Sequence, residues 1–370
     1  METKKSKKKT VQFVLIGIMI VLIAAAFIML AVLGGEKEKV RTYEDYISEG
    51  DKSLESGDKS KAYDNYITAF GMETENDKTA LMFKIFSVTE SEDEKLLMAY
   101  YFLDNAGDDE IYKDDKTAVL EYISKYNDIN SGNPECIYLG TYPQRAVTSE
   151  KIISYLKSDS VKFDEAGFAE VYGKKYAKIE IMNEEKFFTV DKIAWDVLSV
   201  EDGKKVLVST YVLDCEVFME EMVESSWDVS HMREWLSTEF AKTAFTDDEI
   251  KMLELMHINN PFNRCYGYAN GEDVDDYITL LSCEDLINEK YGFNTKDNVS
   301  DEKRVAKCSD YASEKGVFHD DDKNAKWWTI ANGSMSTSYV CVNTNGVVAV
   351  GGELCNNKNI GVRPVITISE

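Results

Sequence analysis

Residues 227–245 read WDVSHMREWLSTEFAKTAF, and this stretch decides how the C-terminal two thirds of the chain fold. Ser230 is a suitable N-cap, because its side chain can accept a hydrogen bond from a backbone amide in the first turn of a helix. The helix that follows carries an apolar stripe with a period of 3.6 residues, formed by Met232, Trp235, Leu236 and Phe240. Such a stripe must face a core, so the stretch predicts a helix buried in a folded domain.

A second short helix is expected directly after the first. Thr246 and Glu249 have the spacing of a capping box, in which each side chain bonds the backbone amide of the other residue. Ile250, Leu253 and either Met256 or His257 would continue its apolar face. The C-terminal run GVRPVITI, residues 361–368, is rich in β-branched residues and predicts a strand of the same domain.

The length and charge of the chain limit its class. With 370 residues, 44% of them hydrophobic, and only four prolines, the chain is expected to form two or three mostly ordered domains. Its formal net charge is -25, and because residues 1–35 contain five lysines and one glutamate, the remaining residues carry -29. A surface this acidic repels nucleic acids and anionic lipid headgroups, so neither is an expected partner.

The N-terminus has the pattern of a membrane anchor. Residues 4–9 include five lysines, and residues 13–33 contain no charged side chain. A helix of ~20 residues crosses a bilayer, whereas the apolar core of a signal peptide is usually ~7–15 residues. We therefore expect a cytoplasmic tail at residues 1–12, a single transmembrane helix at residues 13–33 and an extracellular remainder. A long signal peptide cleaved near Gly34 or Gly35 is the alternative.

Residues 36–130 have a charged, helical pattern. Small and aromatic residues at offsets of 7, 5, 4 and 3 resemble one tetratricopeptide repeat: Gly50, Gly57, Ala62, Tyr66 and Ala69. In that motif the small residues let two antiparallel helices approach, and the aromatic ring fills the gap between them. Thr74 stands where the usual closing proline would be. The segment is expected to be a tetratricopeptide-like helical stalk, with a peptide-binding groove as the alternative.

The pattern changes after residues 127–134, NDINSGNP, which form a polar boundary. Helical candidates after this boundary are a segment capped by Ser282 and Asp285 and residues 301–315, which end before Gly316. Short strand-like segments rich in Val, Ile, Tyr and Trp are residues 137–142, 193–200, 206–212, 277–282, 339–350 and 362–368. An irregular, mostly antiparallel α+β domain is expected over residues 137–370.

Ordered landmarks within residues 137–370 resemble a family of uncharacterised extracellular domains of Gram-positive, especially clostridial, bacteria. They are LGTYPQ (139–144), AWDVL (194–198), VSTYVLD (208–214), W-x5-R-x-WL-x3-F (227–240), AF-x3-E (244–249), LLS-x-E (280–284), AKCSDYA (306–312), WW (327–328) and GVRP (361–364). Where that family usually has WWLRSP, this chain has WWTIANG and lacks the arginine and the proline. The WW and GVRP ending is also similar to C-type-lectin-like and sulfatase-modifying-factor domains, a likeness of fold that implies no function.

Motifs of the common catalytic and metal-binding classes are absent. The sequence contains no nucleophile elbow, Walker loop, H-E-x-x-H helix or EF-hand loop. His231, His257 and His319 have no partner at ligand spacing, and the seven cysteines include no CxxC pair. No catalytic residue, metal ligand or cofactor is predicted, and Cys341 with Cys355 is the one local pair that could form a disulfide.

Two acidic clusters could offer oxygen ligands to calcium. They are residues 272–276, which read EDVDD, and residues 320–322, three aspartates near Asn324. Neither has the alternation and the glycine of a dedicated calcium loop, so solvated loops are expected at both places.

Five residues stand out as structural and three as candidates for ligand binding. Arg233 and Arg363 lie among apolar residues, so each is expected to clamp neighbouring backbone or a carboxylate. Trp327 and Trp328 are adjacent on a predicted strand and point to opposite faces, so one is expected in the core and one exposed for stacking. The candidate ligand-binding residues are Trp327, Trp328 and Arg363, and the structural residues are Trp227, Arg233, Trp235, Gly361 and Pro364.

These observations favour a single-pass membrane protein of the cell envelope with an external, non-catalytic module. The expected partner of the module is a cell-wall glycan or another envelope protein. Two alternatives remain open at this stage: an envelope enzyme whose site forms only in the fold, and a structural component of a membrane assembly.

Overall fold

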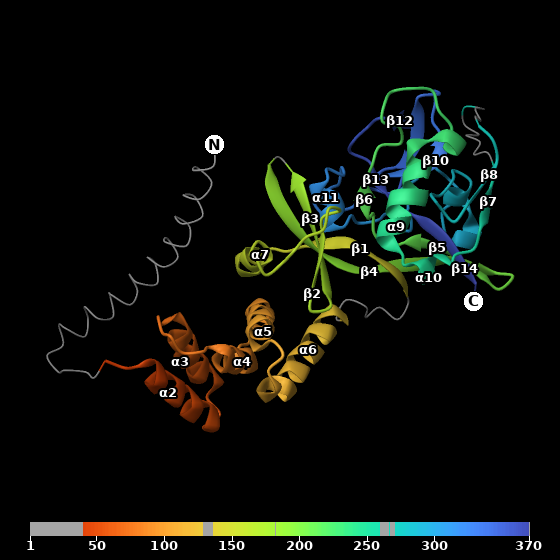
Figure 1. The fold of residues 1–370 in the computed structure, drawn as a ribbon. Helices are drawn as coiled ribbons and strands as arrows, with labels where there is room; N and C mark the ends of the chain where they lie inside the picture. Colours follow the sequence, from red (N-terminus) through yellow and green to blue (C-terminus); the bar gives the residue numbers. More distant parts are fainter. Residues whose placement is uncertain (1–39, 129–135, 182, 260–265, 267–270, 370) are drawn as a thin grey trace. The chain divides into compact units, whose positions relative to one another are not determined.

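The computed structural model of the protein describes residues 40–128, 136–181, 183–259, 266 and 271–369. The chain divides into two compact units, Met1–Leu120 and Glu121–Glu370, with helices in the first and the sheets in the second (Figure 1). The tail and the membrane span expected at residues 1–12 and 13–33 lie outside the described residues. Within the described ranges, no helix is both long and apolar enough to cross a membrane.

The first unit consists of short antiparallel helices. They are α2 (Tyr43–Glu55), α3 (Lys59–Gly71), α4 (Thr79–Val88), α5 (Glu92–Ala106), the 3₁₀ turn η1 (Glu110–Tyr112) and the beginning of α6 (Lys113–Asp128), which continues past Leu120. Thr42 and Asp45 form a capping box at the start of α2, and the side chain of Asp58 caps α3. The helical secondary structure expected for this segment is therefore confirmed.

Gly50 is the point of closest approach between α2 and α3. A Cβ atom at Gly50 would lie 2.4 Å from Cε1 of Tyr66, so only glycine leaves room for this ring. The Tyr66 ring is fully buried, and its hydroxyl donates a hydrogen bond to Oδ1 of Asp51 at 2.6 Å. Ala62 and Ala69 are also fully buried in α3. The alternation of small and aromatic residues thus lets the two helices pack closely.

The second unit is built on two larger sheets and one small one, almost entirely antiparallel. A seven-stranded sheet has the order β2-β3-β4-β5-β14-β9, with β1 paired to β4, and a five-stranded sheet has the order β12-β11-β10-β13-β6, in which β10 and β13 are parallel. The strands are β1 (Ile137–Ala146), β2 (Phe168–Val171), β3 (Lys174–Ile181), β4 (Glu184–Glu201), β5 (Lys204–Ser209), β6 (Asp214–Cys215), β7 (Met256–Ile258), β8 (Val274–Asp276), β9 (Ile278–Thr279), β10 (Trp327–Asn332), β11 (Ser338–Val342), β12 (Val348–Leu354), β13 (Gly361–Val362) and β14 (Val365–Ser369). The α+β class predicted from the sequence is confirmed.

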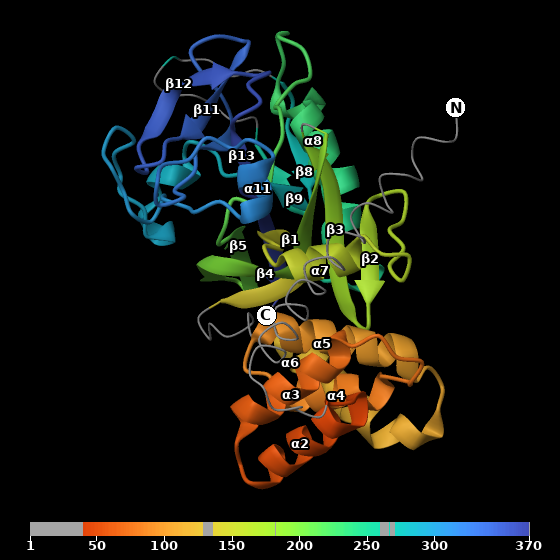
Figure 2. The same cartoon turned by 90° about the vertical axis from the view of Figure 1, so that its left-hand side faces the viewer.

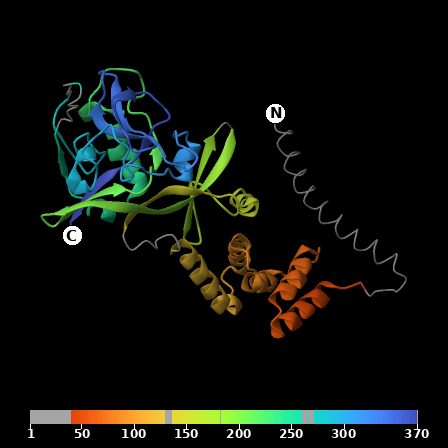
Figure 3. The ribbon, with the colours of Figure 1, turned by 180° about the vertical axis from the view of Figure 1, so that it is seen from behind.

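The sheets are connected by short helices and turns. These are α7 (Glu150–Leu156), η2 (Trp227–Val229), α8 (His231–Trp235), the π turn η3 (Leu236–Phe240), α9 (Ala241–Ala244), α10 (Asp247–Ile250), η4 (Asp285–Ile287), η5 (Glu289–Tyr291) and α11 (Asp310–Glu314). Figure 2 shows the β2–β3 hairpin standing away from the five-stranded sheet, and Figure 3 shows the long β4–β5 ribbon from behind.

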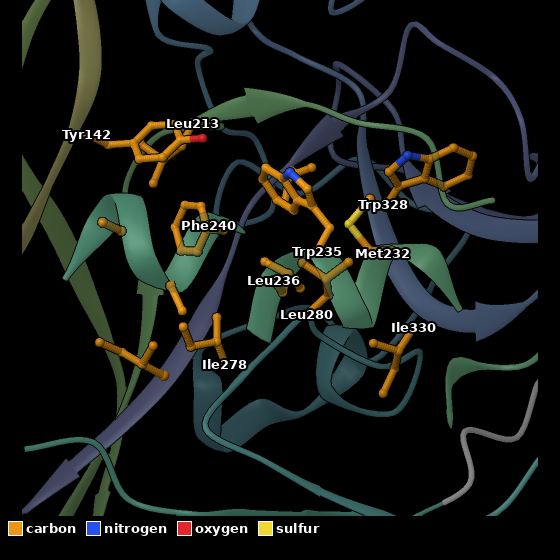
Figure 4. Packing of buried hydrophobic residues seen from close by; sticks show 14 of the residues in the cluster. Tyr142, Leu213, Met232, Trp235, Leu236, Phe240, Ile278, Leu280, Trp328 and Ile330 are labelled. Atoms are coloured by element: carbon orange, nitrogen blue, oxygen red, sulfur yellow. The ribbon is translucent and has the colours of Figure 1, made fainter. Parts of the chain in front are cut away.

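The helix predicted after Ser230 is present as α8, η3 and α9, one continuous helical segment with a π turn at its centre. The Ser230 hydroxyl accepts a hydrogen bond from the Arg233 amide at 3.1 Å, so the predicted N-cap is confirmed. Figure 4 shows Met232, Trp235 and Phe240 directed from this segment into one cluster with Tyr142 and Trp328. All these side chains are buried, as the stripe requires.

Two predicted helices are shorter than expected. The capping box of Thr246 and Glu249 is confirmed, but α10 ends at Ile250, because Leu253 forms a β-bridge with Ile368 and the next amide donates to the terminal strand. The helix predicted for residues 301–315 is reduced to α11, because residues 307–309 instead form bridges and backbone hydrogen bonds with other segments. In both places, pairing with strands distant in the sequence overrides a local helical pattern.

Trp327 and Trp328 point to opposite faces of β10, as predicted, but the expectation that one of them is exposed is wrong. Both side chains are fully buried. Trp328 and Ile330 belong to the cluster that contains the helix stripe, whereas Trp327 and Ala331 belong to a second cluster on the other face. Since this strand has a core on each side, neither indole can stack on a ligand at the surface.

Candidate functional site

The second unit contains a buried carboxylate, Asp214, in the two-residue strand β6. Its side chain is 1% exposed. Nζ of Lys315 lies 2.5 Å from its Oδ1, and the hydroxyl of Tyr142 donates to its Oδ2 at 2.5 Å. The Cys215 amide also donates to Oδ1, at 2.6 Å. A buried carboxylate is stable only when it is paired and hydrogen-bonded, and here both oxygens are satisfied.

Three distant segments meet at this carboxylate. Tyr142 comes from β1, Asp214 from β6, and Lys315 is the C-cap residue of α11. The strand β6 is held in place by β13, where Val362 is opposite Asp214 in the antiparallel register. Tyr311 of α11 packs edge-on against the Tyr142 ring, with the ring centroids 5.9 Å apart.

Burial and the neighbouring carboxylate determine the protonation of this cluster. Burial raises the pKa of Tyr142 well above its ordinary value, and the Asp214 charge adds to the shift. Burial opposes the charge of Lys315, but Asp214 and Tyr311 outweigh it and raise the pKa of that ammonium group. Lys315 is therefore a cation and Tyr142 is neutral at neutral pH.

A recess opens beside this pair. Its volume is about 340 Å³, and it is lined by Cys215, Glu216, Val217, Glu220, Lys315 and Lys358. We call it the Lys315 recess. The side chain of Lys315 is 27% exposed and that of Glu216 is 23% exposed, so both charged groups are reachable from solvent. The volume is within the range of small-molecule sites, and four of the six lining residues are charged.

His231 connects the two acidic side chains of the recess to the helix α8. Its Nε2 lies 3.3 Å from Oε1 of Glu216, and its Nδ1 lies 4.0 Å from Oε1 of Glu220. His231 follows the N-cap of α8, so the helix fixes the position of the ring.

Two buried side chains hold the backbone of the recess. The indole Nε1 of Trp328 donates to the carbonyl oxygen of Glu216 at 3.0 Å. The thiol of Cys215 donates to the carbonyl oxygen of Lys358 at 3.1 Å. Burial raises the pKa of Cys215 to about 12, so this thiol stays protonated and is not a nucleophile at neutral pH.

A second cavity, of about 420 Å³, lies along the same two chain segments. Its lining is Gly316, Val317, Phe318, His319, Lys326, Asn357, Asn359 and Ile360. The one lysine of this lining is already engaged, because Nζ of Lys326 lies 2.7 Å from Oε1 of Glu353 and also over the Phe318 ring. This cavity therefore presents mainly amide groups, and the Lys315 recess has the stronger charges.

The residues predicted to bind a ligand do not line the Lys315 recess. Arg363 is 3% exposed, its Nε donates to the Ser209 carbonyl oxygen at 2.9 Å, and its guanidinium carbon lies 5.2 Å from the centroid of the Trp327 ring. Burial lowers the pKa of Arg363 to about 10, although Asp196 opposes this shift. The structure thus joins Trp327 and Arg363 as a buried stack, and Trp328 reaches the recess only through the backbone of Glu216.

The residues predicted to be structural lie at packing and pairing positions. Trp227 and Arg233 share one buried carboxylate: the indole donates to Oδ2 of Asp276 at 2.9 Å, and the guanidinium Nε donates to Oδ1 at 2.7 Å. Trp235 is buried, and its ring centroid lies 5.5 Å from that of Phe240. At the terminal strands, a Cβ atom on Gly361 would lie 2.2 Å from a Val212 methyl group, and the Pro364 carbonyl oxygen accepts from the Ser209 amide at 2.9 Å.

Neither a disulfide nor a metal cluster is present among the described residues. None of the six described cysteines forms a disulfide, and those of the pair that could have joined, Cys341 and Cys355, are both buried thiols. The described ranges contain no group of three metal-ligating side chains. In the acidic segment 272–276, Asp276 pairs with Arg233, and Oδ1 of Asp275 accepts a hydrogen bond from Nδ1 of His257 at 2.8 Å.

The sequence reading missed Asp214, Tyr142 and Lys315 as site residues. The signal was present, because Tyr142 lies in LGTYPQ and Asp214 ends VSTYVLD, two of the stretches that carry the family resemblance. In the sequence both stretches serve only as landmarks of the resemblance, and nothing local indicates that their polar groups meet.

A family model described as a domain of unknown function (DUF6273) matches residues 202–370. This segment contains Asp214, Glu216, Lys315 and Lys358, whereas Tyr142 precedes it. No curated protein and no solved structure is significantly similar to the chain.

The pH dependence of stability tests the role of Tyr142. We expect Tyr142→Phe to lower the free energy of unfolding at pH 7 by about 1–2 kcal/mol, because Asp214 loses a donor. Above about pH 10 an unfolded tyrosine releases its proton, whereas the folded Tyr142, with its raised pKa, retains it. The free energy of unfolding of the wild type therefore falls as the pH rises, and its difference from that of Tyr142→Phe becomes smaller. Urea unfolding at pH 7 and at pH 10.5 measures this difference in free energy at each pH. A difference that is the same at both pH values contradicts the role assigned to the Tyr142 hydroxyl.

The arginine clamp predicts a loss of stability in Arg233→Ala. The substitution leaves the Asp276 carboxylate, which is 5% exposed, without its cation, so we expect a loss of about 3 kcal/mol in urea unfolding. Adding Asp276→Asn removes the uncompensated charge and should recover part of this loss. Lys242→Ala, at an exposed position of the same helical segment, is the control, with a change within about 0.5 kcal/mol. Wild-type stability in Arg233→Ala would show that the clamp is dispensable for folding.

Proposed function

We propose that the protein is a single-pass, membrane-anchored protein of the cell envelope, and that its second unit is a non-catalytic ligand- or partner-binding module with the Lys315 recess as its site. The division of charge along the chain supports the anchor and its orientation. The lysines of residues 4–9 favour the cytoplasmic side, and the acidic remainder favours solubility outside.

The observation that carries the binding function is the Asp214–Lys315 pair at the edge of the recess. Asp214 keeps Lys315 charged and fixes its position, so the recess presents an ordered cation without first having to reorganise. A preorganised charge of this kind favours recognition, because the ligand does not have to provide the free energy of ordering it. Glu216 and Lys358 have their backbone held by buried side chains, which adds to the rigidity of the site.

The chemistry of the recess favours binding over catalysis. Nucleophilic catalysis needs a deprotonated or activated group, whereas the Cys215 thiol and the Lys315 ammonium both have raised pKa values. An envelope enzyme is the second candidate, and His231 beside Glu216 is the observation that favours it, since a carboxylate can orient an imidazole as a general base.

The first unit serves in this proposal as a tetratricopeptide-like stalk between the membrane and the module. The contact of Gly50 with Tyr66 supports this assignment, because the repeat uses a small residue and an aromatic ring in the same way. The second unit is proposed to be related to the clostridial envelope domains and to have a C-type-lectin-like arrangement. The ordered landmarks support the first of these, and the WW and GVRP ending supports the second.

Protease accessibility tests the orientation. When protease is added to intact cells that express the full chain with a C-terminal tag, we expect the tag to be lost while a cytoplasmic marker protein stays intact. Survival of the tag in intact cells, with digestion only after lysis, would show that the second unit is inside and would refute the envelope role.

A binding screen tests the module. The full chain in detergent is screened against cell-wall polymers, glycans and envelope proteins, and each hit is repeated with Lys358→Met. We expect this variant to bind about tenfold more weakly, which corresponds to about 1.4 kcal/mol. Lys303→Met, at an exposed lysine outside the recess, is the matched control and should bind like the wild type. Equal binding by Lys358→Met and wild type would exclude the recess as the site.

A further inference from the structure

The Lys315 recess presents both signs of charge within a small volume. Two lysines, Lys315 and Lys358, and two glutamates, Glu216 and Glu220, are among the residues that line a cavity of about 340 Å³. A volume of this size can hold a compact ligand. The ligand must therefore satisfy several opposite charges at short range.

The cationic side of the recess is able to bind an anionic group. Lys358 is exposed, and its ammonium group has no ion-pair partner among the described residues, although its backbone is held by the Cys215 thiol. Lys315 forms an ion pair with Asp214, but its side chain remains 27% exposed. An ammonium group has three donors, so it can donate a further hydrogen bond into the recess. A carboxylate of the ligand can accept hydrogen bonds from ammonium groups of this kind.

The acidic side of the recess is able to bind a protonated amine. Glu216 accepts hydrogen bonds through Oε1 from the Val217 amide and is within reach of His231, so the carboxylate is fixed in position. Glu220 is 78% exposed and has His231 as its neighbour at 4.0 Å. An ammonium group of the ligand can donate hydrogen bonds to carboxylates of this kind, whereas two ionised carboxylates cannot pair with each other.

We infer that the recess binds a small zwitterion, a ligand with a free amine and a free carboxylate such as an amino acid or a short peptide. This inference rests on the proposed binding function and specifies its ligand. A ligand with only a negative charge would be repelled by Glu216 and Glu220. A ligand with only a positive charge would leave the Lys358 ammonium group without an ion-pair partner. A ligand with both charges pairs with each side at once, and its two contacts reinforce one another.

Isothermal titration calorimetry with three dipeptides tests the inference on the full chain in detergent. The ligands are glycylglycine, N-acetylglycylglycine, which lacks the amine, and glycylglycinamide, which lacks the carboxylate. We expect glycylglycine to bind at least tenfold more tightly than either derivative. Equal affinities for all three compounds, or no binding of glycylglycine, would overturn the inference.

Two variants assign the charges to their partners. Glu216→Gln should weaken glycylglycine about tenfold and leave N-acetylglycylglycine unchanged, because the acetylated compound has no amine to lose. Lys358→Met should weaken glycylglycine and leave glycylglycinamide unchanged. Glu302→Gln and Lys303→Met, at exposed positions outside the recess, are the matched controls and should bind glycylglycine like the wild type. If either recess variant weakens all three compounds equally, the amine and carboxylate assignments are wrong.

The outcome for this inference is separable from that for the proposed function. If glycylglycine does not bind but an envelope polymer or protein binds in a Lys358-dependent manner, the zwitterion is the wrong ligand and the binding module stands. If neither binds, both are refuted.

Discussion

The second unit depends on the burial of one carboxylate. An unpaired Asp214 would cost several kcal/mol in the interior, so Tyr142 and Lys315 together stabilise β6 in its position. These two residues belong to β1 and to the end of α11, and Val362 of β13 pairs with Asp214. The same charge that joins these elements also fixes Lys315 at the edge of the recess, so the fold and the candidate site share one interaction.

Buried arginines also join separate segments of the unit by hydrogen bonds. Arg304 is fully buried and donates to the carbonyl oxygens of Leu286 at 2.7 Å and of Val299 and Gly346 at 3.2 Å. Arg233 holds Asp276 together with Trp227, and Arg363 holds the carbonyl oxygen of Ser209. Several of the segments joined in this way are short: β8 has three residues, and Val299 and Gly346 lie in loops. A guanidinium group with five donors can satisfy several of their carbonyl groups at once.

Local signals were sufficient for some features of the fold and insufficient for the site. Ser230 caps its helix as predicted, because an N-cap depends on three neighbouring residues. The alternation of Trp327 and Trp328 on β10 was also predictable, but their burial was not, since it depends on separate cores on the two faces of the sheet. Asp214 and Lys315 are about a hundred positions apart in the sequence, and only the pairing of non-adjacent strands brings them together.

The arrangement of charges also explains why rigidity and recognition are linked in this recess. Two of the four charged residues are held by groups that do not face the recess: Asp214 pairs with Lys315, and Trp328 holds the backbone of Glu216. Such support lowers the entropy that a ligand must overcome on binding. It also directs the Lys315 ammonium group to Asp214 rather than to a glutamate of the recess. A recess built in this way can remain open to a small charged ligand in an otherwise strongly acidic chain.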